Sequence, residues 1–382
     1  MLDFDNDAII PSANGSSMIG HPLTGIWATS PINLSDCLFV SRFNAHFPYY
    51  SPLIAVTRNH KVYYWLKGRE DPVDITRSMS EQVGIKVSDI KGVGALSDSV
   101  VIHTSNTAVI IDLSVTGAVV MFSKHEIPTG ISSVNYGNDF ALIRTVGNRL
   151  FWLVDWFKFK IIKGKSVLIE DSFARVAEIK QICCGYVHAY LLMHNGSVYR
   201  REYGKYRVDD AFKSVITQPI AEIVVNHKHV VYISKEGQCY HHISTWFGSS
   251  SPVKIQALNG MTIKRVFLAP EGHTIVAVRD DNTVHMLHSP RGQYLFSHGD
   301  WEEYATIKHL QIFDDKTVSD VVHLNGFMTS IECVSGSESP TGLTIRKRDI
   351  PSLFGCMCSD GCIYWVRCDG KDDIFSHPSL RI

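Results

Sequence analysis

The 382-residue sequence predicts an all-β repeat protein, and three observations support this fold class. Seven segments share one pattern, in which an apolar run, a turn pair and a second apolar run follow one another. Most of them recur at intervals close to the period of a propeller blade, which is roughly 40–50 residues. Little of the chain sustains the apolar stripe of a helix, and the best exception, Ser78–Val83, is expected to be a short loop helix. We therefore expect a seven-bladed β-propeller of four-stranded antiparallel blades, closed by the two termini.

Each repeated segment has the composition of a strand pair. The apolar runs are rich in Val, Ile and Tyr and are bounded by Gly, Asn, Asp or Ser. A further short apolar strand precedes most of them, which predicts an additional strand in each unit. In the fourth copy, Asn195-Gly196 predicts a two-residue hairpin turn, because both residues tolerate a positive φ. The seven segments are Leu53–Trp65, Ser99–Ile111, Phe140–Leu153, Ala189–Arg200, Val230–His241, Thr274–Leu287 and Leu353–Val366.

The overall composition is that of a globular chain with a large core. Hydrophobic residues make up 45% and charged residues 20%, and the formal net charge is −1. A net charge near zero produces no strong electrostatic field that would attract nucleic acid, so direct nucleic-acid binding is not expected. No 18-residue apolar span predicts membrane insertion. Nine irregularly spaced cysteines, together with an acidic amino terminus, favour an intracellular location, either cytoplasmic or nuclear.

The fourth copy carries a more specific pattern. Ile182 is followed by two small residues, Gly185, two free positions, His188, another small residue and an apolar run, and Gly196-x-Val198-Tyr199 comes later. This pattern resembles the repeat of the regulator of chromosome condensation family, which forms seven-bladed propellers. The Trp-Asp and Gly-Gly signatures of two other propeller families are missing in register. The resemblance implies structural roles for Gly185, His188 and Gly196, with an unusual backbone conformation at Gly185 and a hydrogen bond from His188 to the inner loop.

The ends of the chain fit one closed domain over residues 1–382. Residues 1–35 form either an extension or a closing strand for the last blade, with the segment around Gly25–Thr29 as the candidate strand. Residues 334–352 read as an insertion in the last blade, rich in Ser, Gly and Pro, with a basic cluster at Arg346, Lys347 and Arg348. Such a loop is expected to be exposed, and it is either a binding element or a tolerated extension.

Basic residues also follow two neighbouring repeats. Lys158 and Lys160 alternate with apolar residues, which places them on one face of a strand, and the next repeat contributes Arg200 and Arg201. One interpretation is that lysines protect an outer edge strand from aggregation. The other is a docking surface for an acidic partner or for phosphates. The predicted partner-binding residues are Lys158, Lys160, Arg200, Arg201, Arg346, Lys347 and Arg348.

No motif predicts catalysis, a cofactor or a metal. Gly164-Lys165-Ser166 ends like a phosphate-binding loop, but Phe159 stands where that motif requires glycine. Cys356, Cys358, Cys362 and Cys368 favour small buried hydrophobic residues over a zinc site. No carboxylate or nucleophile can be assigned to His188 from the sequence. We therefore expect no catalytic residue, no cofactor and no metal.

The sequence thus predicts a non-enzymatic protein-interaction propeller, a scaffold or adaptor subunit of a larger assembly. The family resemblance implies an alternative, a guanine-nucleotide exchange factor for a Ran-like small GTPase. A propeller hydrolase or lyase with a polar central site is a third class.

Overall fold

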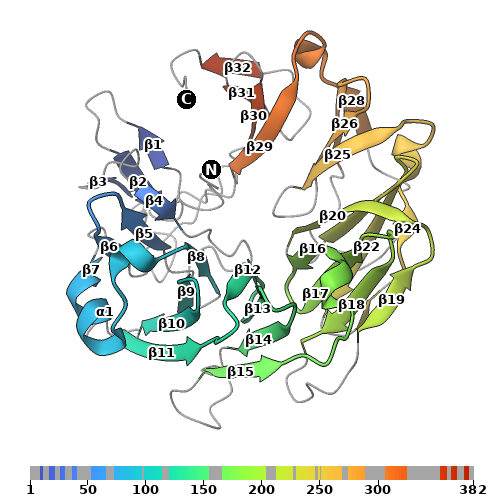
Figure 1. The fold of residues 1–382 in the computed structure, drawn as a ribbon. Helices are drawn as coiled ribbons and strands as arrows, with labels where there is room; N and C mark the ends of the chain where they lie inside the picture. The colour runs from blue at the N-terminus through green and yellow to red at the C-terminus, as the bar shows by residue number, and fades with distance from the viewer. Residues whose placement is uncertain are drawn as a thin grey trace, which may run out of the picture.

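The protein folds as a seven-bladed β-propeller. The computed structural model describes residues 9–11, 17–21, 26–30, 37–40, 53–65, 73–96, 99–113, 120–154, 166–203, 212–226, 229–245, 248–249, 251–268, 274–288, 306–324, 353–358, 363–367 and 374–377. Among these residues, six sheets have four strands, one has five and one has three. Figure 1 shows the sheets arranged around a central axis, with the first strand of each blade nearest that axis. The fold class predicted from the repeats is confirmed.

Each blade is built from consecutive antiparallel strands. The first three blades are β4 (Cys37–Val40), β5 (Leu53–Thr57), β6 (Val62–Trp65) and β7 (Val73–Asp74); β8 (Gly92–Ala95), β9 (Ser99–His103), β10 (Thr107–Leu113) and β11 (Val120–Glu126); and β12 (Ile131–Tyr136), β13 (Phe140–Thr145), β14 (Leu150–Val154) and β15 (Val167–Glu170). Blades four and five are β16 (Ile179–Cys184), β17 (His188–Met193), β18 (Val198–Glu202) and β19 (Lys213–Ile216), and β20 (Ile220–Asn226), β21 (His229–Ser234), β22 (Cys239–Thr245), β23 (Gly248–Ser249) and β24 (Val253–Lys254). Blades six and seven are β25 (Ile263–Leu268), β26 (Thr274–Arg279), β27 (Val284–His288) and β28 (Thr306–His309), and β29 (Val318–Leu324), β30 (Leu353–Cys358), β31 (Ile363–Arg367) and β32 (Ile374–His377).

The seven repeated sequence segments are the hairpins formed by the second and third strands of each blade. The turn at Asn195-Gly196 differs from the predicted two-residue form. The amide of Met193 donates to the carbonyl of Ser197 and the amide of Gly196 donates to the carbonyl of Met193, which defines a three-residue loop. Only Gly196 of the predicted pair has a positive φ, 94°. A tight turn followed by one residue in the left-handed conformation already matches the right-handed twist of the two strands. Asn195 therefore does not need a positive φ.

The same hairpin recurs around the ring. In five blades, the fourth residue of the turn has a positive φ and donates its amide to a carbonyl three positions earlier. Glycine fills this position twice, and asparagine or histidine fills it in the other blades. The turn thus requires a backbone conformation that several residue types can adopt. Because the residue type varies at this position, the repeats are hard to recognise from residue identity alone. The five residues are His60, Asn148, Gly196, Gly237 and Asn282.

Backbone hydrogen bonds connect each of several hairpins to the next blade. The amide of Ile220, the first residue of β20, donates to the carbonyl of Gly196 in the preceding blade at 2.9 Å. The amide of Ile263 donates to the carbonyl of Gly237 at the same distance, one blade further on. Apolar clusters fill the space between successive sheets from blade one to blade seven, so each of blades two to six buries both of its faces.

Strand pairing assigns the connections to two faces of the ring. The tight hairpins and the connections between blades lie at one end of the strands, which we call the hairpin face. The paired ends Val154 with Val167 and His188 with Glu202 lie at the other end, which we call the loop face. The long connections within blades, such as those from β14 to β15 and from β29 to β30, join strand ends on the loop face.

The expectation that the amino terminus supplies the outer strand of the last blade is wrong. β3 (Ile26–Ser30) pairs with β2 (Ser17–His21), which pairs with β1 (Ile9–Pro11), and these three strands form a separate sheet. The outer strand of blade seven is β32, which pairs with β31. The short carboxyl-terminal segment after Trp365 is thus long enough to complete its own blade. In Figure 1 the three-stranded sheet occupies the part of the ring between the first and last blades.

Within the described residues, helical structure is limited to the hairpin face. The helix expected around Ser78–Val83 is confirmed as α1 (Thr76–Val83), which follows blade one and buries Met79 and Val83. A short 3₁₀ turn, η2 (Val87–Asp89), leads from α1 into blade two. No helix in the described part of the chain is long and apolar enough to cross a membrane.

Candidate functional site

Arg200 and Arg201 project from opposite faces of β18, as neighbours on a strand must. Arg201 is 7% exposed and forms an ion pair with the carboxylate of Asp171 in the connection from blade three. Asp171 also accepts hydrogen bonds from the indole nitrogen of Trp152 at 2.6 Å and from the amide of Phe173 at 2.8 Å. The guanidinium of Arg201 lies 5.3 Å from the ring centroid of Trp152. Arg201 therefore joins blade four to blade three and presents little surface to a partner.

Arg200 points toward blade five. Its Nη1 donates to Nε2 of His242 at 3.2 Å, and Nδ1 of His242 lies 2.9 Å from the hydroxyl of Tyr232. Because a guanidinium can only donate, Nε2 of His242 accepts and Nδ1 carries the proton. Arg200 is half-buried, whereas His242 is fully buried.

The other sequence-predicted basic residues lie outside the described residues. Lys158 and Lys160 belong to the connection from β14 to β15, and Arg346, Lys347 and Arg348 belong to the connection from β29 to β30. The strand ends that flank both connections lie on the loop face. Their role in partner binding stays a prediction.

Gly185 and Gly196, two glycines of the repeat motif, lie where neighbouring blades come close together. The carbonyl of Gly185 lies 3.0 Å from the position that a Cβ of Gly137 would occupy, so blades three and four meet closely there. A Cβ on Gly196 would lie 3.0 Å from the amide nitrogen of Ile220 in blade five. Gly185 is not among the described glycines with a positive φ, the conformation that most favours glycine. Its amide donates to the carbonyl of His188 at 2.8 Å and closes the turn from β16 to β17.

His188 lies between blades four and five and is 2% exposed. Its Nδ1 shares a hydrogen bond with the hydroxyl of Ser244 on β22, so its partner belongs to the neighbouring blade rather than to its own inner loop. A carboxylate oxygen of Glu202 lies 3.9 Å from Nε2. Serine, histidine and glutamate therefore meet at a place where no sequence motif indicates a triad. The serine follows 56 residues later, and only the packing of two blades brings it to His188.

This arrangement lacks the properties of a catalytic triad. Ser244 is 1% exposed, so a substrate cannot reach its hydroxyl. Burial, and then the nearby charge of Arg200, lower the pKa of His188 to about 3. An imidazole with so low a pKa is a poor general base near neutral pH. The contact is therefore a structural link between blades.

The buried imidazole predicts a specific pH dependence of stability. With a pKa of about 3, His188 stays neutral in the folded protein, whereas it takes up a proton below pH 6.5 in the unfolded chain. Its contribution is complete above pH 6.5 and is lost as the pH falls from 6.5 to about 3, at up to about 1.4 kcal/mol per pH unit.

Urea unfolding at pH 7, 6, 5 and 4, with the wild type and His188→Gln side by side, measures this slope. Burial also lowers the pKa of His103, His125 and His285, and subtraction of the two curves removes their shared effect. A stability difference between the two proteins that stays constant from pH 7 to pH 4 would contradict a neutral His188.

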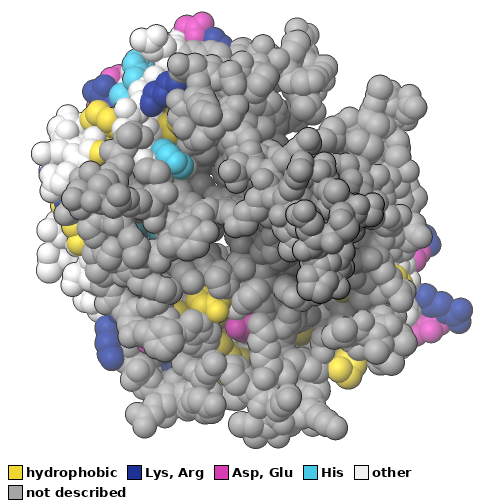
Figure 2. All heavy atoms as spheres, turned by 180° about the vertical axis from the view of Figure 1, so that it is seen from behind, with side chains coloured by type: hydrophobic (Ala, Val, Ile, Leu, Met, Phe, Trp, Pro, Cys, Tyr) yellow, Lys and Arg dark blue, Asp and Glu magenta, His cyan; other side chains and the backbone are white. Residues whose placement is uncertain are grey.

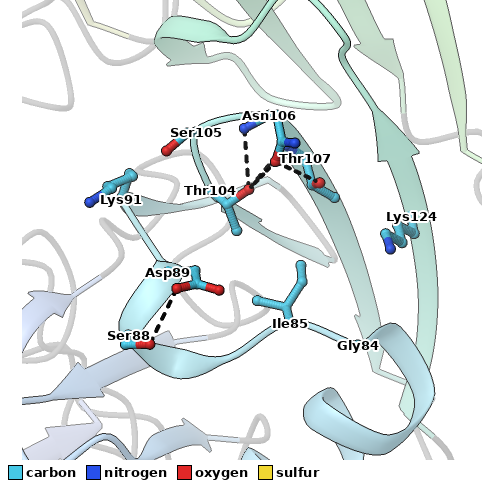
Figure 3. Close-up of a pocket in the computed structure, with 10 residues that line it drawn as sticks. All are labelled: Gly84, Ile85, Ser88, Asp89, Lys91, Thr104, Ser105, Asn106, Thr107 and Lys124. Atoms are coloured by element: carbon cyan, nitrogen blue, oxygen red, sulfur yellow. Dashed lines mark hydrogen bonds between the residues drawn. The ribbon is translucent and has the colours of Figure 1, made fainter.

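The hairpin face holds a polar pocket of about 300 Å³ beside blade two, drawn in Figure 3. The connection from α1 through η2 forms one wall, and the turn between β9 and β10 forms another. Lys91 and Lys124 stand on opposite sides, with Asp89 and Thr104 between them. Sequence reasoning missed this pocket because its residues come from three segments without a shared motif. Its lining residues are Gly84, Ile85, Ser88, Asp89, Lys91, Thr104, Ser105, Asn106, Thr107 and Lys124.

The turn that lines the pocket is ordered by its own side chains. The hydroxyl of Thr104 accepts from the amide of Thr107 at 3.0 Å and from the amide of Asn106 at 3.3 Å. The hydroxyls of Thr104 and Thr107 both donate to Oδ1 of Asn106, at 3.2 and 3.3 Å. On the opposite wall, the hydroxyl of Ser88 donates to the carboxylate of Asp89 at 3.2 Å.

The described residues offer little for metal or thiol chemistry. Within them, no three His, Cys, Asp or Glu side chains are arranged to hold a metal ion. Burial raises the pKa of the Cys183 thiol to about 12, and it does the same for Cys239. Thiols with such values are almost wholly protonated near neutral pH and react slowly.

Comparison with known proteins gives a likeness of fold. No protein-family model matches the chain, and no curated protein sequence matches it. Prp20p of Saccharomyces cerevisiae, the yeast RCC1 protein, is 14% identical with a TM-score of 0.44, over 75% of this chain and 80% of that one. Hsv2 of Kluyveromyces lactis is 10% identical with a TM-score of 0.49, over 89% and 97%. BamB of Moraxella catarrhalis is 11% identical with a TM-score of 0.43, over 96% and 93%.

Proposed function

We propose that this protein is a non-enzymatic interaction propeller that acts inside the cell as a scaffold or adaptor subunit of a larger assembly. The observation that carries this proposal is the division of the ring into two unlike faces. On the hairpin face, tight turns are bonded to the next blade, as Gly196 is to Ile220. The loop face carries the longest connection, from β29 to β30, and the long connections from β14 to β15 and from β27 to β28, beside several tight turns. A rigid ring that presents long loops on one face suits the binding of other proteins.

The buried polar groups support a structural rather than a catalytic role. Arg201, His188 and His242 each bond to a group from a neighbouring blade. Ionic and hydrogen-bonded links of this kind fix how two packed elements sit against each other. Blades three to five are thus preorganised, and a partner need not order them on binding.

Figure 2 shows the molecule from behind the view of Figure 1, with a group of His and Lys or Arg side chains at the upper left. This is the sector that blade six occupies in Figure 1, seen from the other side. Charged and imidazole groups at the rim of an interface affect partner choice and association rate more than affinity. We therefore expect binding to weaken as salt rises.

Co-purification of the tagged full-length chain from its own cells tests the proposal. We expect stable partners at near-stoichiometric amounts, and a reduced yield when Lys158 and Lys160 are changed to Glu. The matched control changes Lys86 and Lys264 to Glu, two exposed lysines outside the loop-face connections, and should retain the partners. Absence of any stable partner would contradict the scaffold role. Accelerated nucleotide release from a small GTPase on addition of the protein would replace it with the exchange-factor alternative.

A further inference from the structure

The pocket beside blade two offers hydrogen-bond donors in excess of acceptors. Among the described residues, the ammonium of Lys91, the hydroxyl of Ser105 and the side-chain nitrogen Nδ2 of Asn106 have no hydrogen-bond partner within the protein, whereas the backbone amide of Asn106 donates to Thr104. The acceptor oxygen of Asn106 is already occupied by the hydroxyls of Thr104 and Thr107, which turns its two N–H donors away from that turn. A ligand for these groups must therefore be rich in acceptor oxygens.

The charges of the residues that line the pocket also favour a ligand rich in acceptor oxygens. Lys91 and Lys124 stand on opposite walls, and Asp89 is the one acidic lining residue. Lys124 lies 3.6 Å from a carboxylate oxygen of the exposed Glu126, a pair that is open to solvent and therefore weak. The carboxylate of Asp89 accepts a hydrogen bond from the hydroxyl of Ser88, which stabilises its charged form. Both lysines are exposed, and their side chains must turn inward to hold one anion between them.

The lining also excludes other ligand classes. No aromatic ring lines the pocket, so a nucleobase or a sugar ring would have nothing to stack on. A single carboxylate is too few for a Ca²⁺ site, and no metal-holding group exists within the described residues. The hydroxyl, amide and ammonium donors that remain are those that bind phosphate oxygens in proteins.

We propose that this pocket binds a phosphate monoester, and that its source is a phosphorylated serine or threonine side chain of a partner protein. The proposal rests on the interaction role and adds the chemistry of the partner. Lys91 and Lys124 hold the phosphate from its two sides, Asn106 and Ser105 donate to its oxygens, and Asp89 accepts from an N–H group of the partner's backbone. The pocket lies on the hairpin face, so it is separate from the loop-face connections.

Fluorescence polarisation with a labelled alanine-based pentapeptide that carries a central phosphoserine, and with its unphosphorylated twin, tests the proposal on the full chain. We expect the phosphopeptide to bind at least tenfold more tightly than the twin. The double variant Lys91→Met/Lys124→Met should abolish this difference. Lys86→Met is the matched control, because Lys86 is exposed in the same connection but does not line the pocket, and it should keep the difference.

Three outcomes would overturn the inference. They are equal binding of the two peptides, full binding by the double variant, and an equal loss in the Lys86→Met control. Inorganic phosphate distinguishes the source, since we expect it to compete at least tenfold more weakly than the phosphopeptide, and equal affinity would overturn the assignment to a protein partner. Partners that co-purify without phosphopeptide binding would defeat this inference alone, whereas phosphopeptide binding without stable partners would defeat the scaffold role alone.

Discussion

Replacement of Asp171 by alanine should lower the free energy of unfolding by about 3–5 kcal/mol, the loss expected when one member of a buried ion pair is removed. The guanidinium of Arg201 would then remain 7% exposed without its counter-charge. The indole N–H of Trp152 and the amide of Phe173 would lose their acceptor as well. Urea unfolding followed by tryptophan fluorescence measures the loss.

Two further variants make this prediction specific. Glu170→Ala breaks the neighbouring but exposed pair with Arg149 and should change stability little. Asp171→Leu combined with Arg201→Met removes both charges and should recover much of the loss, because an apolar pair of similar volume avoids the unpaired charge. If Asp171→Ala unfolds at the wild-type urea concentration, the buried link between blades three and four is wrong.

Replacement of Gly196 by alanine should cost about 2–3 kcal/mol. A φ of 94° is a conformation that residues with a Cβ resist, at about 1–3 kcal/mol. The added Cβ would also lie 3.0 Å from the amide nitrogen of Ile220 and 3.1 Å from its carbonyl oxygen. Both atoms belong to the backbone of the next blade, so they yield only if the blades move apart.

Asn148 provides the matched control for this prediction. It occupies the equivalent turn position in blade three, with a φ of 55° that asparagine tolerates. Asn148→Gly should therefore leave the melting temperature within a few degrees of the wild type, whereas Gly196→Ala should lower it clearly. Equal small shifts in the two variants would mean that the turn of blade four is not held against blade five.

The sequence predicted the parts of this fold that depend on local chemistry. Alternating apolar residues and turn residues predicted all seven hairpins and the short helix, and these are confirmed. The turn at Asn195-Gly196 was assigned the wrong length because the same residue pair suits two turn types. The closing strand was misassigned because pairing between distant segments leaves no mark on either one.

The contacts at these sites could not be predicted from the sequence for a similar reason. Ser244 and Glu202 reach His188 only through strand pairing and blade packing, and Asp171 finds Arg201 in the same way. The basic residue Arg201 reads like a surface charge in the sequence, yet Asp171 and Trp152 enclose it. A polar side chain on a strand that is buried on both faces therefore cannot be assigned to the surface from its type alone.

An experimental density map of the full-length protein is the most direct test of the central claim, the closed ring of seven blades. We expect seven radial antiparallel sheets of four or five strands around one axis, with a last blade built from β29 to β32 and with β1, β2 and β3 in a separate sheet. Sheets stacked face to face without an axis, or an amino-terminal strand paired to β31 in place of β32, would contradict it.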